Sequence, residues 1–337
     1  MLRLLIFSFL LTATTLQTAR ATIWRVNNGL EAPSQVDFNE LKAAVEDGQV
    51  QSGDTIYVEG SAVSYEGDIE INKSLTIIGP GYLLAQEQTQ PTLCNQLPAR
   101  VSGTQSITLR PGSDGTTITG MTLARITTRG VSNIVIHRNQ FESLFISSET
   151  NFTFNNNVII TNNLVCNIIQ VFGSGTVAND VYIANNLVGD EISSRFASVS
   201  TTTVINNTMP PGGRISIEGA SVTFNYTGTI DPDVETNQVA SNILNNNNAD
   251  NQAIVAINGT NVIDPYTGDF MTCSTDDWRL QSNDATDQHG AFNGPLPLYA
   301  DEDFPANLPP VPAIFECSVD ACGDEIITVS FQVRSNQ

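Results

Sequence analysis

Basic residues are scarce in this 337-residue chain. It contains 14 lysines and arginines against 35 aspartates and glutamates, so its formal net charge is −21 at pH 7. Such an acidic surface repels polyanions, which argues against nucleic acid, an anionic lipid surface or a strongly acidic glycan as the partner of the whole surface. A soluble secreted repeat protein would carry the same excess of acidic residues. The net charge therefore excludes some classes of partner but does not identify the actual one.

Histidines, cysteines and the motifs of cofactor sites are also rare. The chain has two histidines, His137 and His289, and five cysteines, none of them at the C-x-x-C spacing of zinc sites. A phosphate loop, a dinucleotide fingerprint and a nucleophile elbow are missing. We therefore expect no cofactor and no metal site. One alternative stays open, because the acidic stretch 264–303 has enough carboxylates for a structural calcium ion, although not at EF-hand spacing.

Long apolar segments are missing after the start of the chain. The first eleven residues form an apolar run with one arginine, too short to cross a bilayer, and Ala19-Arg20-Ala21 has the form of a signal-peptidase site. The pattern predicts a signal peptide over residues 1–21, no membrane span, and a secreted or cell-surface chain that begins near Thr22. Its removal leaves twelve basic and 35 acidic residues, a net charge of −23.

The cysteine count is odd, so the five cysteines cannot all pair within one molecule. An exported chain meets oxidising conditions, and Cys317 and Cys322 lie five residues apart across a predicted turn. We expect these two to form a disulfide. The sequence does not pair the remaining cysteines, which are Cys94, Cys166 and Cys273.

The feature that the chain does have is a repeat between residues 118 and 262. A six-residue pattern, apolar-x-x-Asn-x-apolar, returns eight times, with Met121 and Thr260 in place of asparagine in the first and last copies. The copies begin at Ile118, Ile136, Ile160, Ile183, Val204, Val222, Val239 and Ile257. These starts lie 18, 24, 23, 21, 18, 17 and 18 residues apart. A short pattern at a period near twenty indicates a solenoid.

The residue types inside the repeat favour one kind of solenoid. Valine, isoleucine, threonine and phenylalanine dominate, and glycine, asparagine, aspartate and serine separate the short segments. A leucine-rich repeat of similar period would show a stricter leucine pattern. The sequence therefore predicts an all-β fold, a parallel β-helix whose coils stack about 4.8 Å apart, and we expect a monomer.

The recurrent asparagine has two interpretations. Asparagine tolerates the left-handed backbone of tight turns, and its amide carries both a donor and an acceptor. Stacked amides could be offered to a ligand, or they could bond one another inside the protein. We expect the internal ladder, which comprises Asn139, Asn163, Asn186, Asn207, Asn225 and Asn242.

Both ends of the predicted solenoid carry elements that suit a cap. Asp37 and Glu40 form a capping-box pattern that predicts a short helix over residues 38–46, placed to cover the first coil. Residues 314–319 and 326–333 predict a β-hairpin, which we expect to cover the last coil. The predicted division is therefore a signal peptide (1–21), a β-helix domain with its N-terminal cap (22–285), and a Pro/Gly-rich linker with a C-terminal cap (286–337).

Several segments carry a resemblance to a known group of proteins. They are Gly53-Asp-Thr-Ile-Tyr-Val58, Ser74-Leu-Thr-Ile-Ile-Gly-Pro-Gly-Tyr82, Asp277-Trp-Arg-Leu280, Gly290-Ala-Phe-Asn-Gly-Pro295 and Pro312-Ala-Ile-Phe315. Together they resemble secreted right-handed parallel β-helix proteins of the kind found in Bacteroidota, within the broad pectate-lyase-like fold group. The resemblance implies a right-handed helix. It does not imply an activity.

Enzymes of that fold group cleave acidic polysaccharides, but their signatures are missing here. The Asn-x-Asp, Asp-Asp, Gly-His-Gly and Arg-Ile-Lys set of polygalacturonases is not present, nor is the Arg-x-Pro-x-x-Arg pattern of pectate lyases. If adjacent coils align, Arg125 or Arg129 would share one side with His137 and Arg138. Such a basic patch could bind a uronate or sulfate group, or it could be ordinary solvated charge.

Two functions from different classes follow. The first is a non-catalytic secreted or surface β-helix that contacts a glycan or mediates adhesion through its long sheet face. The second is a divergent polysaccharide lyase or glycoside hydrolase that acts on a uronate-containing chain. The missing signatures favour the first. A long loop expected over residues 83–106 is another place where a binding site could be built.

Overall fold

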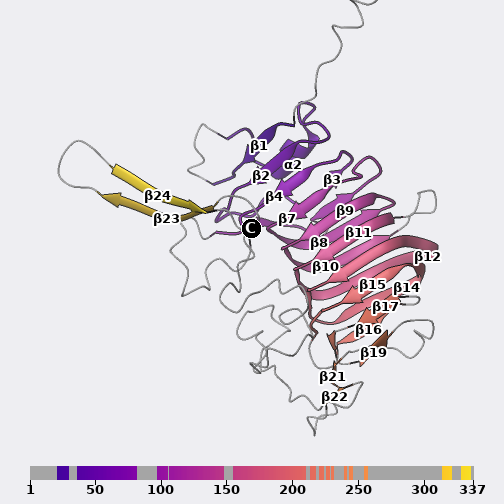
Figure 1. Cartoon of the computed structure of the whole chain (residues 1–337). Coiled ribbons are helices and arrows are strands. Elements are labelled where there is room, and N and C mark those ends of the chain that lie inside the picture. Colours follow the sequence, from indigo (N-terminus) through magenta and orange to yellow (C-terminus); the bar gives the residue numbers. More distant parts are fainter. Residues whose placement is uncertain are drawn as a thin grey trace, which may run out of the picture.

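The computed structural model shows a long stack of strands, which runs from β1 at one end to β21 and β22 at the other (Figure 1). The residues that it describes are 21–29, 36–81, 97–104, 106–147, 155–209, 213–217, 220–223, 225–227, 229–230, 239–240, 243–245, 254–256, 313–320 and 328–334. Strands contain most of these residues, α2 (Leu41–Glu46) is the one helix among them, and most of the strands pair in parallel.

The parallel strands form three series, which we call columns 1, 2 and 3. Column 1 contains β1 (Ile23–Val26), β2 (Thr55–Val58), β4 (Thr76–Ile78), β7 (Thr117–Thr119), β9 (Ser132–His137), β11 (Asn155–Thr161), the end of β12 (Leu164–Ala184), β15 (Thr202–Ile205), β17 (Ala220–Thr223) and β20 (Val239–Ala240). Column 2 contains β5 (Ala99–Val101), the first residues of β8 (Met121–Arg129), of β10 (Gln140–Ser147) and of β12, and β13 (Leu187–Val188). Column 3 contains β3 (Ile69–Ile71), β6 (Ile107–Leu109), the later parts of β8 and β10, the middle of β12, β14 (Glu191–Ser200), β16 (Arg214–Ser216) and β19 (Thr229–Ile230). The chain passes through the columns in turn, an arrangement compatible with a parallel β-helix.

The predicted repeat sets the register of column 1. Ile118 pairs with Ile136, Ile136 with Ile160, and Ile160 with Ile183. The series continues through Val204 and Val222 to Val239, so the first apolar residue of each repeat lies beside the first apolar residue of the next. The parallel strands and the period near twenty are thus confirmed over this part of the chain.

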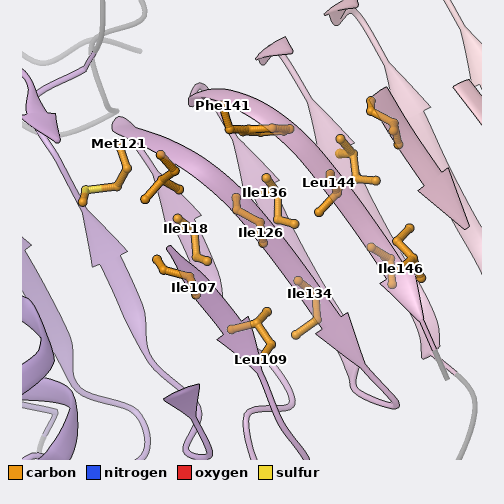
Figure 2. Packing of buried hydrophobic residues seen from close by; sticks show 14 of the residues in the cluster. Ile107, Leu109, Ile118, Met121, Ile126, Ile134, Ile136, Phe141, Leu144 and Ile146 are labelled. Carbon is orange, nitrogen blue, oxygen red and sulfur yellow. The ribbon is translucent and has the colours of Figure 1, made fainter. Parts of the chain in front are cut away.

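These paired residues form the core. Their side chains from Ile118 to Val222 are completely buried, and each one stacks on the equivalent side chain of the neighbouring strand, as at Ile118, Ile136, Ile160 and Ile183. Figure 2 shows the upper part of this stack with residues of columns 2 and 3, among them Phe141 and Leu144, which point into the same interior. Burying one such side chain is worth about 1.5–3 kcal/mol, so the repeated apolar positions supply most of the driving force for stacking.

The corner between columns 1 and 2 turns on a row of left-handed residues. Gly120, Arg138, Asn162, Asn185 and Asn206 all have φ between 53° and 72°. Gly120 needs to be glycine, because a Cβ there would lie 2.4 Å from the carbonyl oxygen of Gly79. The left-handed residue is therefore the one before the recurrent asparagine, and the expectation that the recurrent asparagine itself adopts this backbone was wrong.

The recurrent asparagines form an internal ladder. Asn139, Asn163, Asn186, Asn207 and Asn225 are each completely buried. In every step, the backbone N–H and the amide Nδ2 of one asparagine donate to Oδ1 of the next, over distances of 2.9–3.2 Å. The predicted ladder is thus present at these five positions. The sixth, Asn242, lies outside the described residues.

The helix at the N-terminal end is shorter than predicted. The helix α2 (Leu41–Glu46) begins after Glu40, and no side chain caps it. Asp37 instead bonds to the backbone of Arg25 in β1, and Glu40 accepts a hydrogen bond from the backbone of Glu66, so the predicted capping box was wrong. The buried side chains of the helix, Leu41, Ala44 and Val45, belong to the core cluster, which agrees with the predicted covering role.

The predicted loop over residues 83–106 also needs correction. Its last part contains β5, whose buried residues Ala99 and Val101 pair with Met121 and Leu123, so the chain rejoins the stack earlier than expected. Residues 82–96 lie outside the described part of the chain.

The predicted C-terminal hairpin is present as β23 (Ala313–Asp320) and β24 (Thr328–Arg334), an antiparallel pair that forms a sheet of its own. It is drawn away from the three-stranded sheet of β18 (Tyr226–Thr227), β21 (Ile243–Asn245) and β22 (Ile254–Ala256), so the structure does not show it covering the last coil (Figure 1). The Cys317–Cys322 disulfide, His289, the acidic stretch 264–303 and the signal peptide involve residues or side chains outside the described part.

Candidate functional site

The four residues predicted to form one basic patch lie on two different columns. Arg125 pairs with Ser143 and Arg129 with Ser147, both in column 3. His137 pairs with Thr161 at the end of its strand in column 1. Arg138 follows it, at the corner that leads to column 2. The expected alignment of all four was therefore wrong, and only Arg125 and Arg129 share a strand.

The outer face of column 3 combines aromatic, basic and polar side chains. The guanidinium carbon of Arg125 lies 4.9 Å from the centre of the Phe145 ring, a cation–π contact. Phe172 is 46% exposed and is the only aromatic residue among the exposed large apolar side chains of the described residues. Register places Gln170 and Ser193 in a row with Phe145. We call Arg125, Phe145, Gln170, Phe172 and Ser193 the column 3 face.

A second basic group adjoins this face. Leu109 pairs with Thr128, so the residues that follow them, Arg110 and Arg129, lie side by side. Arg110 Nη2 forms an ion pair with Glu70 Oε1 at 2.6 Å. Burial lowers the pKa of Arg129, the neighbouring charge of Arg110 lowers it further, and Glu70 partly offsets both effects. Two arginines beside one carboxylate leave this end of the face with a local positive charge on an acidic protein.

No pattern in the sequence predicted the aromatic part of this face. Phe145 and Phe172 lie outside the six-residue pattern, and nothing in their spacing marks them as neighbours of Arg125 and Arg129. Alternation within a strand predicts which side each residue faces, but only the pairing of β8, β10 and β12 brings them together.

His137 lies outside the column 3 face and is not suited to acid–base work at neutral pH. Its Nδ1 is 2.9 Å from Thr161 Oγ1. Burial and the adjacent charge of Arg138 lower its pKa to about 4, although the contact with Thr161 opposes this shift. The ring is therefore neutral at pH 7.

We expect the depressed pKa of His137 to make the fold sensitive to acid. In the unfolded chain this histidine takes up a proton at about pH 6.5, whereas in the folded chain it stays neutral down to about pH 4. The folded state therefore loses stability as the pH falls from about 6.5 to about 4. His137→Thr, which matches the neighbouring Thr119 and Thr161 in the column, should remove this loss of stability, which is about 3 kcal/mol for a shift of this size. Denaturant unfolding at several pH values measures the free energy of unfolding of parent and variant. If this free energy falls equally with pH in both proteins, His137 is not the cause of the acid sensitivity.

Three further observations bear on the site. Cys166, in β12, is disulfide-bonded, which the sequence did not predict. No group of three or more histidine, cysteine, aspartate or glutamate side chains comes close enough to hold a metal ion among the residues that the structure describes. Within the same residues, no helix has the length and apolar character needed to cross a membrane.

Comparisons of the chain with protein-family models, with curated proteins and with solved structures found no match. The resemblance to secreted Bacteroidota proteins therefore stays a prediction.

Proposed function

We propose that this protein is an exported, non-catalytic, right-handed parallel β-helix that binds a polysaccharide through the column 3 face. The stacked parallel strands, the internal asparagine ladder and the apolar column support the β-helix. The disulfide at Cys166 supports an oxidising compartment outside the cytoplasm. The predicted cleavage site at residues 19–21 supports the same location.

One observation carries the glycan proposal, namely the Arg125–Phe145 contact beside the exposed ring of Phe172. An aromatic ring offers apolar surface with a negative face to the C–H groups of a sugar ring. A guanidinium group held in place binds a carboxylate through paired hydrogen bonds. Gln170, whose Nε2 donates to the buried Ser193 Oγ at 3.4 Å, adds an amide that can donate to or accept from hydroxyl groups. The flat row of strands suits an extended chain better than a compact ligand.

The charge of the arginines suggests the substituents of that polysaccharide. Arg125, Arg129 and Arg110 lie in column 3 or directly follow its strands, whereas the whole chain is strongly acidic. A long polyanion would be repelled at low salt. We therefore propose a polysaccharide with spaced uronate groups, of which a few contact these arginines.

The expected result is that the purified mature protein binds a soluble uronate-containing polysaccharide, and that Arg125→Ala combined with Phe172→Ala weakens binding about tenfold or more. Arg138→Ala is the matched control, because it removes the same charge from a different corner of the molecule. Equal losses for both variants, or no binding by the parent protein, would contradict the proposal. Binding is measured by titration calorimetry at two salt concentrations.

A polysaccharide lyase is the second candidate, and the side-by-side placement of Arg110 and Arg129 favours it. A lyase must neutralise a substrate carboxylate before the adjacent proton is abstracted, and Arg110 and Arg129 place two guanidinium groups side by side at the end of column 3. We expect no turnover of pectate or alginate. Ultraviolet absorbance of unsaturated uronate, measured with and without calcium, decides between the non-catalytic protein and the lyase. Sustained turnover that disappears in Arg129→Lys would establish the lyase.

A further inference from the structure

The backbone nitrogen of Thr22 is bonded to a buried carboxylate. It lies 2.7 Å from Oδ1 of Asp54, a side chain in a residue that is only 3% exposed. Thr22 itself is exposed, and its carbonyl oxygen accepts a hydrogen bond of 2.9 Å from the backbone of Thr55. Thr22 is therefore fixed from both sides at the point where the stack begins.

Asp54 is held in its ionised form by the groups around it. Its Oδ2 accepts hydrogen bonds from Trp24 Nε1 at 2.8 Å and from the backbone of Gln51 at 2.9 Å. Burial alone would raise the pKa of Asp54, but the bonds from Gln51, Trp24 and Thr22, with the charge of Lys73, lower it overall. A negative charge thus lies beside the residue predicted to start the mature chain.

We propose that Ala21–Thr22 is the bond cut during export, and that the ammonium group of Thr22 created by this cut binds the Asp54 carboxylate and stabilises the fold. This inference rests on the proposed export of the protein. The step is a hydrolysis by a signal peptidase: water adds to the carbonyl carbon of Ala21, the C–N bond breaks, Ala21 keeps a carboxylate, and the nitrogen of Thr22 takes up protons to become an ammonium ion.

The geometry needs no rearrangement for this change. A distance of 2.7 Å already lies in the range of N⁺–H···O⁻ bonds, which are about twice as strong as neutral ones. Since Thr22 is exposed, the other hydrogens of the ammonium group reach solvent, and little desolvation opposes the new charge. The uncut precursor makes only the amide bond here, so processing would strengthen the end of the stack.

The other charged group near Asp54 is Lys73. Its Nζ donates to the carbonyl oxygens of Asp47 at 2.9 Å and Val50 at 2.8 Å, which holds it in place. A free terminal amine titrates at about 7.7–8.0, and an opposite charge at this distance raises its pKa by about 1–3 units. The stabilisation should be complete below about pH 8 and disappear as the pH rises through the raised pKa.

The test compares two forms of the mature protein, one that begins at Thr22 and one that keeps Ala21, each with Asp54 and with Asp54→Asn. With Asp54, the Thr22 form should melt about 2–4 °C higher between pH 6 and pH 8, and the difference should vanish near pH 11. With Asp54→Asn, the two forms should melt alike. Equal melting temperatures with Asp54, or a difference that survives Asp54→Asn, would overturn the ion pair.

Two measurements keep the proposal testable if Asp54→Asn does not fold. The mature chain has only three amines, at Thr22, Lys42 and Lys73, so ¹³C-methylation and NMR titration can follow the terminal one separately. An ordinary pKa for the Thr22 amine would overturn the ion pair. Terminal sequencing of the exported protein should read Thr22 first, and any other start would overturn the cleavage site. None of these results depends on glycan binding.

Discussion

Replacing Asn186 with alanine should lower the free energy of unfolding by about 3 kcal/mol. Its Oδ1 accepts hydrogen bonds of 3.0 Å from the backbone and from the amide of Asn163, while its Nδ2 donates to Ile160, Ala184 and Asn207. The substitution leaves at least two buried polar groups without partners, and each such group costs about 1–3 kcal/mol. Denaturant unfolding of the parent and the variant measures the difference.

An exposed asparagine pair supplies the matched control. Asn179 Nδ2 donates to Asn156 Oδ1 at 3.0 Å between neighbouring strands, but this pair is exposed to water. Asn156→Ala should therefore cost less than about 1 kcal/mol, because water replaces the lost partner. If both substitutions cost the same, burial does not distinguish the two rows, and the ladder contributes nothing special to stability.

Ile160→Ala should cost about 3–4 kcal/mol, the second large effect. Ile160 is completely buried between Ile136 and Ile183, so truncation removes apolar contacts on both sides and leaves a cavity inside a regular stack. Substitutions of this kind cost 2–5 kcal/mol, depending on how far the surroundings collapse. A strand that is paired with a neighbouring strand on both sides has little freedom to close the gap.

The neighbouring residue tests the orientation of the strand. Ile159 has the same side chain but points to the opposite face of β11 and is only half-buried. Ile159→Ala should cost about 1 kcal/mol. A larger loss for Ile159 than for Ile160 would mean that the strand is shifted by one residue, which exchanges the two faces. Thermal and denaturant unfolding of both variants decide this.

The register of column 1 could be predicted because two signals coincide in the repeat. The first apolar residue of each copy and the asparagine three positions later keep a fixed spacing, so aligning the copies aligns both the core and the corner. A lone apolar run would have left the pairing open. The ladder followed from the same alignment, since stacked amides at the strand spacing are within bonding distance.

Column 3 could not be predicted in the same way, because the corner before it varies in length. The inward residue of column 3 follows the last apolar residue of the repeat by three positions in β8 and β10, at Ile126 and Leu144, but by four in β12, at Ile169. A register shift after Phe141 absorbs the extra residue. A pattern of fixed spacing therefore cannot predict which residues lie together on the column 3 face. For this reason the predicted basic patch combined residues of different columns.

The helix cap shows a local signal overruled by pairing with a distant segment. Asp37 and Glu40 have the spacing of a capping box, yet Asp37 accepts a hydrogen bond from the backbone of Arg25, and Glu40 accepts one from Glu66. Both side chains thus connect segments of the stack rather than the first turn of α2. The sequence identified a helix at this place but not the residue where it begins.

All amides of the asparagine ladder point the same way, so their dipoles add along the axis of the stack, as peptide dipoles do along an α-helix. The oxygen end of this row is Asn139 Oδ1, and it accepts a hydrogen bond from the backbone N–H of Met121 at 3.0 Å. A main-chain group therefore terminates the row. Because the donor is a backbone N–H, this bond does not need an asparagine side chain at position 121, and the buried methionine fills the core there instead. Methionine therefore replaces asparagine in the first repeat without leaving the dipole row open at its negative end.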